Sequence, residues 1–288
     1  MDRQQCVLVL GATGYAGRHL VQRLHDDGYR VRAVVRDKQR ALETGAYDAP
    51  ALHGRVDEWI VSSDGSQLDA SIMTEVDHVV SALGVTRQQA DPWTVDFLLN
   101  LHYLKLAEQQ DVKTFMYIGV MNAATGTSTV SRAKHAFMEA LSRSSVRSQI
   151  VNPSAYFSDL TEVLNLARRG MAFGLGNGSV QLSPIHGADL ADFCLAKLTD
   201  DDASTWDVGG PEVLTYCQVV QLAFQTLGRK ERYLPIPGVV ASSAVWLTDR
   251  ASPRAASLTR FFLEGIQTDS VGALYGHRTL GEYYASLR

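Results

Sequence analysis

The sequence predicts an α/β fold in which a doubly wound parallel sheet is followed by a small second lobe. Through residues 6–152, short runs rich in valine and isoleucine alternate with longer amphipathic stretches. Several of the short runs are apolar on both faces, as strands buried in a parallel sheet are. Strand–helix alternation of this kind forms right-handed crossovers, which build a doubly wound sheet. After about residue 153 the alternation stops, so the second lobe is expected there.

The elements of the first half follow in order from these patterns. The apolar run "CVLVL" is typical of a buried strand, and the amphipathic "YAGRHLVQRL" that follows its glycines is typical of a helix. Short β-branched runs predict strands at 6–10, 30–35, 56–61, 77–82, 114–119 and 148–152. Apolar residues at helical spacing predict helices at 15–27, 38–46, 66–74, 92–110 and 132–143.

The later part of the chain has a different rhythm. "AYFSDLTEVLNLARRG" has helical spacing and a glycine stop, which predict a helix at 155–170. The glycine-rich stretch 173–187 is expected to form a hairpin or an extended loop. The remaining patterns predict a helix at 188–198, a strand at 205–210, and helices at 215–228 and about 240–265.

Composition argues against several classes of protein. The 288 residues are 45% hydrophobic and 20% charged, which is typical of a soluble globular protein. The net charge of −4 argues against non-specific nucleic-acid binding and against a basic membrane-surface protein. The three cysteines lack CxxC spacing and are expected to be reduced thiols. Because no run is long enough for a signal peptide or a spanning helix, we expect a cytoplasmic protein that crosses no membrane.

The segment "VLVLGATGYAGRHLVQRL" has the pattern of a phosphate-binding loop. Gly11, Gly14 and Gly17 follow a buried strand and open an amphipathic helix. Glycines allow a tight turn and a close approach of the backbone to a pyrophosphate, while the helix N-terminus offers N–H groups and partial positive charge. This context predicts a Rossmann-type dinucleotide-binding domain. The loop residues expected around the cofactor are Gly11, Ala12, Thr13, Gly14, Tyr15, Ala16 and Gly17.

The end of the second strand, "AVVRDKQR", bears on the choice of cofactor. Asp37 lies at the distance from the glycines where an acidic residue would bond the ribose 2′-hydroxyl of NAD. Arg36 comes first off the strand, however, and Lys38 follows closely. A guanidinium binds a 2′-phosphate as a fork, so NADP (NADPH) is expected, with NAD the less favoured alternative.

The chain resembles the atypical short-chain dehydrogenase/reductases, in particular their NmrA-like and isoflavone-reductase-like branch. The glycine loop is specific for this superfamily, and the later matching segments are less specific. The similarity spans nearly the whole chain through "VLVLGATGYAGRHLVQRL", "AVVRD", "VKTFMYIG", "AKHAFMEAL", "SQIVNPSAYF", "PIHGADLADF" and "WDVGGPEVLT".

This resemblance implies the roles of two domains and of several residues. It implies an NAD(P)-binding Rossmann domain at 1–153, to which 183–210 return, and a substrate-binding lobe at 154–182 and 211–288. It also implies that the nicotinamide lies over the carboxyl ends of the strands. Adenine is then expected near Asp64, and the rest of the cofactor along Ala82, Leu83, Gly84, Asn152, Pro153 and Ser154.

The catalytic residues of that superfamily are only partly present. Typical short-chain reductases carry Tyr-x-x-x-Lys and a serine at the preceding strand end, and the lysine bonds the nicotinamide ribose and lowers the pKa of the tyrosine. Lys134 matches the lysine, but Val130 stands at the tyrosine position. Gly119 and Val120 stand where the serine is expected.

Several mechanisms therefore stay open. Lys134, or a water that it holds, could transfer the proton, as is thought for isoflavone-reductase-like enzymes. Hydride could instead pass to an acceptor that needs little protein acid, such as a quinone, a flavin or another conjugated electrophile. Alternatively, the chain binds NADP without turnover as a redox sensor or regulatory protein, or carries out a non-redox reaction on a reductase scaffold.

Of these functions, the sequence favours an NADPH-dependent reductase that transfers hydride to a small conjugated organic substrate such as a quinone, an enone or a ketone. The candidate catalytic residues are Lys134 and Tyr156. The candidate substrate-binding residues are Trp93, Asn122, Tyr156, Phe157 and His186. Core packing would explain Tyr156 and Phe157 equally well, and capping of the following helix is the simpler explanation of His186.

The expected partner is a small-molecule substrate, with no nucleic acid and no membrane. No metal site is expected, because the eight histidines show no paired ligand spacing. A monomer and a homodimer are both compatible with the sequence.

Overall fold

The computed structural model describes residues 3–85, 90–237 and 260–288, and the chain forms two compact units. The first comprises Met1–Gly119, Ala133–Asn152 and Leu190–Trp206, and the second comprises Val120–Arg132, Pro153–Asp189 and Asp207–Arg288. The predicted division of the chain into a cofactor-binding domain and a substrate-binding lobe stays a prediction.

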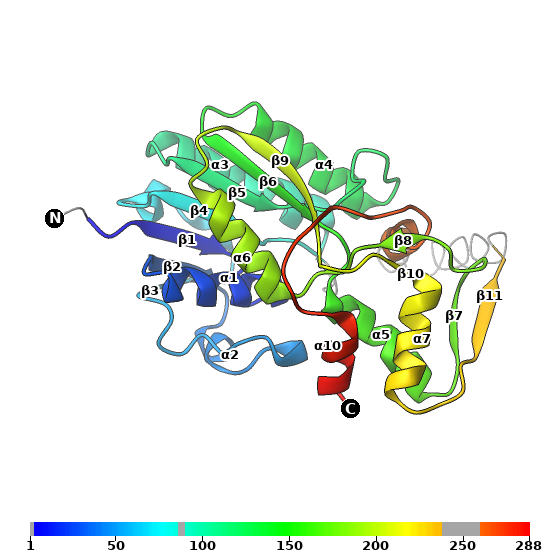
Figure 1. Ribbon diagram of the computed structural model, residues 1–288. Helices are drawn as coiled ribbons and strands as arrows, with labels where there is room; N and C mark the ends of the chain where they lie inside the picture. Colours follow the sequence, from blue (N-terminus) through cyan, green and yellow to red (C-terminus); the bar gives the residue numbers. More distant parts are fainter. Residues whose placement is uncertain (1–2, 86–89, 238–259) are drawn as a thin grey trace. The chain divides into compact units, whose positions relative to one another are not determined.

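The central sheet confirms the predicted doubly wound, Rossmann-type architecture (Figure 1). Its strand order is β12-β9-β6-β5-β4-β1-β2-β3. The order reverses at β1, which pairs in parallel with both β2 and β4, and such a switch point is where this architecture binds its ligands. The strands are β1 (Cys6–Leu10), β2 (Arg30–Val35), β3 (Glu58–Val61), β4 (His78–Ser81), β5 (Thr114–Ile118), β6 (Arg147–Pro153), β9 (Ser204–Gly209) and β12 (Ala273–Leu274).

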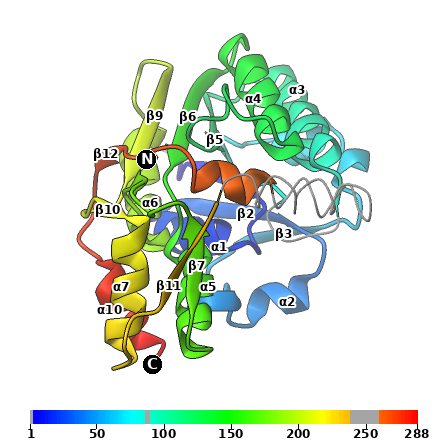
Figure 2. The ribbon, with the colours of Figure 1, turned by 90° about the vertical axis from the view of Figure 1, so that its right-hand side faces the viewer.

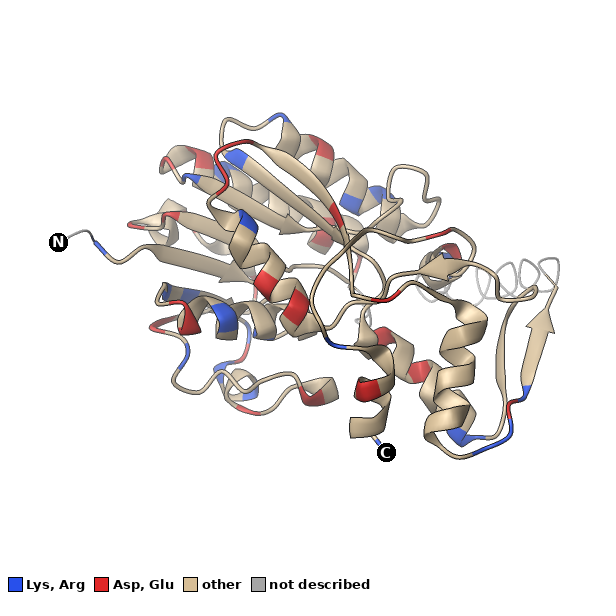
Figure 3. Ribbon diagram, in the orientation of Figure 1, with Lys and Arg blue, Asp and Glu red and all other residues tan. Residues whose placement is uncertain are grey.

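Helices cover both faces of this sheet. The helices are α1 (Tyr15–Asp26), α2 (Lys38–Leu42), α3 (Asn100–Gln109), α4 (Thr129–Ser142) and α6 (Gly187–Leu198). Helices α1 and α6 share one face, where Arg23 Nε lies 2.6 Å from Asp192 Oδ1, and α3 lies on the other face (Figure 1). Charges of both signs are interspersed along these helices, which is typical of their solvent-facing sides (Figure 3).

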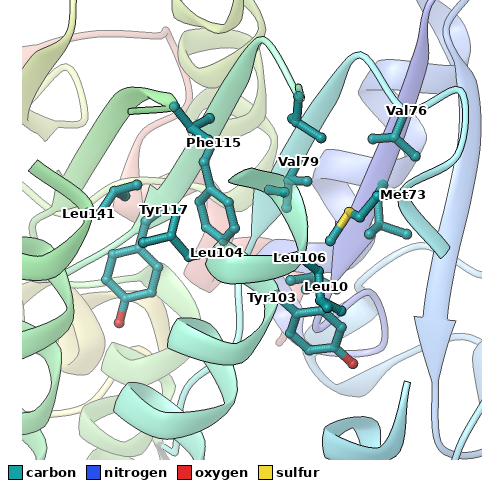
Figure 4. Close-up of a cluster of buried hydrophobic side chains, with 14 of the residues drawn as sticks. Leu10, Met73, Val76, Val79, Tyr103, Leu104, Leu106, Phe115, Tyr117 and Leu141 are labelled. Atoms are coloured by element: carbon teal, nitrogen blue, oxygen red, sulfur yellow. The ribbon is translucent and has the colours of Figure 1, made fainter. Parts of the chain in front are cut away.

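The core between the sheet and α3 is apolar and rich in aromatic rings (Figure 4). Phe115 and Tyr117 on β5 both pack against Phe137 of α4, with ring centroids 5.8 and 4.7 Å apart. Burial of each such ring contributes about 1.5–3 kcal/mol. This packing fixes β5 and α4, the two elements that later bring Tyr117 and Lys134 together.

The helix predicted at 66–74 is wrong. The chain forms two separate 3₁₀ turns there, Gly65–Gln67 (η2) and Ala70–Met73 (η3). Asp64 and Asp69 each accept the backbone N–H two residues later, at 3.0 and 2.9 Å. Each carboxylate therefore caps its own turn, and a second cap so soon after the first competes with a continuous helix.

Helix α2 is also shorter than the predicted 38–46, because a buried arginine binds the carbonyl oxygens around its end. Arg18 is only 2% exposed. Its guanidinium donates to the backbone oxygens of Thr13, Arg40, Ala41, Glu43 and Pro50. Arg18 thus ties the glycine loop to the segment that follows β2.

The second unit has its own apolar core, to which the described helices α5 (Phe157–Arg168), α7 (Tyr216–Thr226) and α10 (Leu280–Ser286) contribute (Figure 2). The hairpin predicted as one option for 173–187 is wrong, because the two strands formed there pair with later parts of the chain. The pairs are β7 (Ala172–Leu175) with β11 (Tyr233–Ile236), and β8 (Gln181–Leu182) with β10 (Leu214–Thr215). The helix predicted at about 240–265 lies outside the described residues as far as 259, and 260–265 are helical.

His78, on β4, should make the fold sensitive to acid. The imidazole is 1% exposed and packs edge-on against Tyr29, and burial lowers its pKa to about 4 from 6.5. The folded chain therefore keeps His78 neutral while the unfolded chain takes up a proton below pH 6.5. Its contribution is complete above that pH and is lost as the pH falls, by about 2 kcal/mol between pH 7 and pH 5.

Urea unfolding at pH 7 and pH 5 measures this effect. In the His78→Phe variant, the loss of unfolding free energy on acidification should be smaller by about 2 kcal/mol. An unchanged loss would show that His78 is not responsible.

Candidate functional site

The glycine loop is held so close to two strand ends that side chains would not fit. Gly11 has a φ of +73°, and a Cβ there would lie 2.6 Å from the carbonyl oxygen of Ala82, just after β4. A Cβ at Gly17 would lie 2.1 Å from the carbonyl oxygen of Gly11. Helix α1 is capped by Gly14, which has no side chain to accept the first N–H groups of the helix. The loop therefore presents bare backbone at a helix N-terminus, which fits the pyrophosphate of a dinucleotide.

In the segment after β2, the side chain of an acidic residue accepts a hydrogen bond from the backbone. Asp37 caps α2, because its Oδ1 accepts the N–H of Arg40 at 3.2 Å. Arg36 and Lys38 are exposed on either side of it, and the Nζ of Lys38 lies 5.6 Å from the centre of the Trp59 ring. The position that would read the ribose 2′-hydroxyl in NAD is thus flanked by cations that suit a phosphate.

Asp64, which the resemblance places near adenine, lies at an exposed turn. Its Oδ1 accepts both the N–H and the hydroxyl of Ser66, at 3.0 and 2.7 Å. These hydrogen bonds stabilise the carboxylate and lower its pKa. A role toward adenine stays a prediction.

Lys134 is a buried member of an ion pair. The residue is 6% exposed, and its Nζ lies 2.9 Å from Asp96 Oδ1. It also donates to the hydroxyl of Tyr117 at 3.4 Å. Burial is the largest influence on the Asp96 carboxyl and raises its pKa, while the ammonium of Lys134 acts in the opposite direction. Lys134 is therefore not an exposed surface lysine of the usual kind.

Asp96 lies on an unusual helical turn. The helix predicted at 92–110 begins as a π-helix, Trp93–Leu99 (η4), and continues as α3. The side-chain amide of Asn100 donates to the backbone oxygens four and five residues before it, at 3.0 and 3.2 Å. Its own oxygen accepts the hydroxyl of Ser81 at 2.6 Å. Asn100 thus supports the wide turn and ties it to the end of β4, and π-turns of this kind are frequent at functional sites.

Gly84, in the loop after β4, is needed for the close approach of the ion pair. A Cβ at this position would lie 2.7 Å from the Nζ of Lys134 and 2.9 Å from Asp96 Oδ1. The bare backbone at Gly84 therefore lies directly beside the lysine. The glycines at positions 11, 17 and 84 all lie against neighbouring protein atoms too closely for a side chain, so bare backbone lines this end of the strands.

The structure gives a physical reason for the missing serine. A Cβ at Gly119 would lie 2.3 Å from the side-chain oxygen of Asn152, so this amide takes the space that a serine would need. Val130, at the tyrosine position, is fully buried. The phenol of Tyr117 does not replace the missing acid, because burial raises its pKa to about 12 and the residue is fully covered.

Two of the predicted substrate residues have other contacts. Trp93, on η4, is 40% exposed and packs edge-on against Phe97. Asn122 has a φ of +60°, and its side-chain amide donates to the backbone oxygen of Asp269 at 3.0 Å. Their substrate-binding roles stay predictions.

The other predicted substrate residues lie in the second unit. Phe157 is 1% exposed and packs between Tyr283 and His186, with ring centroids 5.5 and 5.7 Å away. His186 Nδ1 accepts the N–H of Ala188 at the start of α6, at 3.1 Å. Tyr156 caps α5 from its backbone and is partly exposed. These contacts agree with core packing for Phe157 and with helix capping for His186. The substrate-binding roles of these residues stay predictions.

Pro153 and Ser154 lie at the end of β6. Pro153 is the last residue of that strand. The hydroxyl of Ser154 donates to the backbone oxygen of Ser270 at 2.6 Å and accepts the N–H of Ser183 at 3.2 Å. Ser154 therefore ties together three segments of the second unit, and its role beside a nicotinamide stays a prediction.

Comparison with known proteins places the chain. Residues 11–201 match a protein-family model described as NAD(P)H-binding. Divinyl chlorophyllide a 8-vinyl-reductase of Zea mays is 28% identical over 302 residues, covering 97% of this chain and 70% of that protein. NADH dehydrogenase [ubiquinone] 1 alpha subcomplex subunit 9 of Arabidopsis thaliana is 25% identical over 256 residues, covering 82% of this chain and 61% of that protein.

Solved structures show the same fold with either cofactor. The NADPH-dependent quinone oxidoreductase of Escherichia coli complexed with NADPH has a TM-score of 0.74 at 15% identity, covering 98% of this chain and 99% of that one. The UDP-glucose 4-epimerase of Thermus thermophilus in complex with NAD has a TM-score of 0.63 at 17% identity, covering 81% and 86%. In the described part of this chain, no helix has both the length and the apolar character needed to cross a bilayer.

Proposed function

The chain belongs to the family of NAD(P)H-binding proteins, and from that membership we propose that it is an NADPH-dependent reductase of a small conjugated organic acceptor, such as a quinone, an enone or a ketone. The observation that carries the proposal is the ion pair of Lys134 and Asp96 beside Gly84. It puts a buried cation next to the loop along which the cofactor is expected. A positive charge there suits a site that must stabilise negative charge on an acceptor during hydride transfer.

Each part of the proposed site has a physical task. The glycine loop and the N-terminus of α1 hold the pyrophosphate, and Arg36 binds the 2′-phosphate. Lys134 donates hydrogen bonds to the nicotinamide ribose. NADPH supplies a hydride when it is bound, and a proton from solvent completes a two-electron reduction to the reduced acceptor and NADP⁺. Conjugated acceptors fit best because their reduced anions need no strong protein acid, and Tyr117 is too weak an acid to serve as one.

The names of the relatives support this choice of acceptor. The maize relative is named as a vinyl reductase and the bacterial neighbour as a quinone oxidoreductase. The first name describes reduction of a vinyl group, and the second describes a redox reaction of a quinone.

A panel of quinones, enones and ketones tests the proposal. NADPH oxidation by the purified chain should be measurable by the loss of nicotinamide absorbance with at least one member. Saturable NADPH binding without turnover on the whole panel would contradict the proposal and favour a dinucleotide sensor, which the missing serine and tyrosine would suit.

Arg36 provides a test of the preference for NADPH. Replacing Arg36 with Gln removes a fork of charged hydrogen bonds, so NADPH affinity should fall about 10- to 100-fold while NADH affinity changes less than about twofold. Fluorescence titration with each cofactor gives both values. Lys105→Gln, an exposed charge on α3, is the matched control and should change neither. Equal losses for the two cofactors in the Arg36 variant would contradict the assignment.

A further inference from the structure

The partner of Lys134 is held more rigidly than the lysine itself. The Asp96 side chain is completely buried, and its Oδ2 accepts the N–H of Val85 at 3.0 Å. Its backbone oxygen accepts from the amide of Asn100, which is tied to Ser81 at the end of β4. A lysine side chain has four rotatable bonds, whereas this carboxylate accepts one backbone N–H and belongs to a turn that Asn100 holds in place. Asp96 therefore determines where the ammonium lies.

The surroundings of the ammonium favour its charged form. Within the described residues, Asp96 from η4 and Tyr117 from β5 contact the ammonium of Lys134, and the backbone at Gly84 lies beside them. Asp91, just before η4, is the next acidic residue to act on the pair, and it adds further negative charge. If Lys134 gave up its proton, Asp96 would be left as a buried carboxylate without its counter-ion, which is costly. Tyr117 offers only a neutral hydroxyl in compensation.

On the basis of the proposed function, we infer that Asp96 is the positioning residue for Lys134 and keeps it as an oriented ammonium throughout turnover. Lys134 then donates hydrogen bonds to cofactor or acceptor and does not act as a base. Bound NADPH would supply the hydride and solvent the balancing proton, so the charge on Lys134 would be the same before and after turnover. This inference distinguishes between the two catalytic roles that the sequence left open for the lysine.

Replacing Asp96 with Asn tests the inference, since it removes the charge but keeps an oxygen for the Val85 N–H. Turnover should fall about 10- to 100-fold. The Lys134 ammonium, followed by NMR of its side chain, should titrate at least about one pH unit lower than in the unmodified chain. Activity should decline at the alkaline side over the same lowered range. NADPH affinity should change much less than turnover.

Two other variants separate this role from a merely structural one. Asp91→Asn removes the same charge five residues earlier, where Asn can still cap Thr94, and should leave turnover within about twofold. Asp96→Glu keeps the charge and should restore the alkaline titration of Lys134 in part. An Asp96→Asn chain with an unshifted Lys134 titration, or with turnover reduced only as much as the folded fraction, would overturn the inference.

The outcome can be separated from that of the proposed function. If the unmodified chain turns over no acceptor, the proposed function fails, while the NMR titration still reports whether Asp96 holds Lys134 charged. If Asp96→Asn does not fold, the titration in the unmodified chain decides. An ammonium that persists above about pH 10 supports the inference, and one that loses its proton near neutral pH overturns it.

Discussion

Replacing Lys134 with Met should lower kcat/KM for NADPH oxidation by about 100- to 10,000-fold with the best acceptor of the panel. The change removes the buried ammonium that lies beside Gly84. It also leaves the Asp96 carboxylate without its counter-ion, so the free energy of unfolding should fall by about 3–5 kcal/mol. Steady-state kinetics and urea unfolding measure the two effects separately.

A double variant separates catalysis from stability. Lys134→Met combined with Asp96→Asn removes both buried charges, and most of the lost unfolding free energy should return. Activity should stay as low as in the single variant, because the ammonium is still missing. Recovery of activity together with stability would mean that Lys134 serves the fold alone.

Replacing Gly17 with Ala should reduce NADPH affinity by at least about 100-fold, which corresponds to about 2.7 kcal/mol of binding free energy. The added Cβ would lie 2.1 Å from the carbonyl oxygen of Gly11, so the loop must move away from the place where it meets the pyrophosphate. Fluorescence titration with NADPH measures the loss.

Gly14→Ala is the matched control for this change. A Cβ at Gly14 lies 3.3 Å from the same carbonyl oxygen, which requires only a small adjustment. NADPH affinity should therefore fall much less, by about tenfold or below. Circular dichroism spectra should show both variants folded, and equal affinities for Gly17→Ala and the unmodified chain would contradict the assigned phosphate loop.

The sequence was sufficient for the sheet and for the loop that defines the family. Buried parallel strands such as Cys6–Leu10 are apolar throughout, so a short stretch of sequence is enough to recognise them. The glycines at 11 and 17 can also be recognised locally, because close backbone contacts allow only glycine at these two positions.

The features that the sequence did not reveal depend on competing local hydrogen bonds or on partners far along the chain. At 66–74 the side chains of Asp64 and Asp69 cap two short turns in place of the expected helix. The spacing of apolar residues does not show this capping. The strand β7 pairs with β11, far along the chain, and no local pattern specifies such a partner.

Asp96 was the functional candidate that sequence reasoning missed. The signal was an aspartate among the apolar residues of "WTVDFLLN", where a buried carboxylate needs a partner. Its partner, Lys134, lies on another helix, so only the tertiary structure joins the two. Asn152 was expected beside the cofactor, but only the tertiary structure shows that its amide lies against Gly119.

Equilibrium titration of the purified chain with NADPH and with NADH, in one buffer, tests the central claim most directly. We expect saturable binding of one NADPH per chain, at least about tenfold tighter than NADH. Absence of binding to either nucleotide by a folded chain would contradict it.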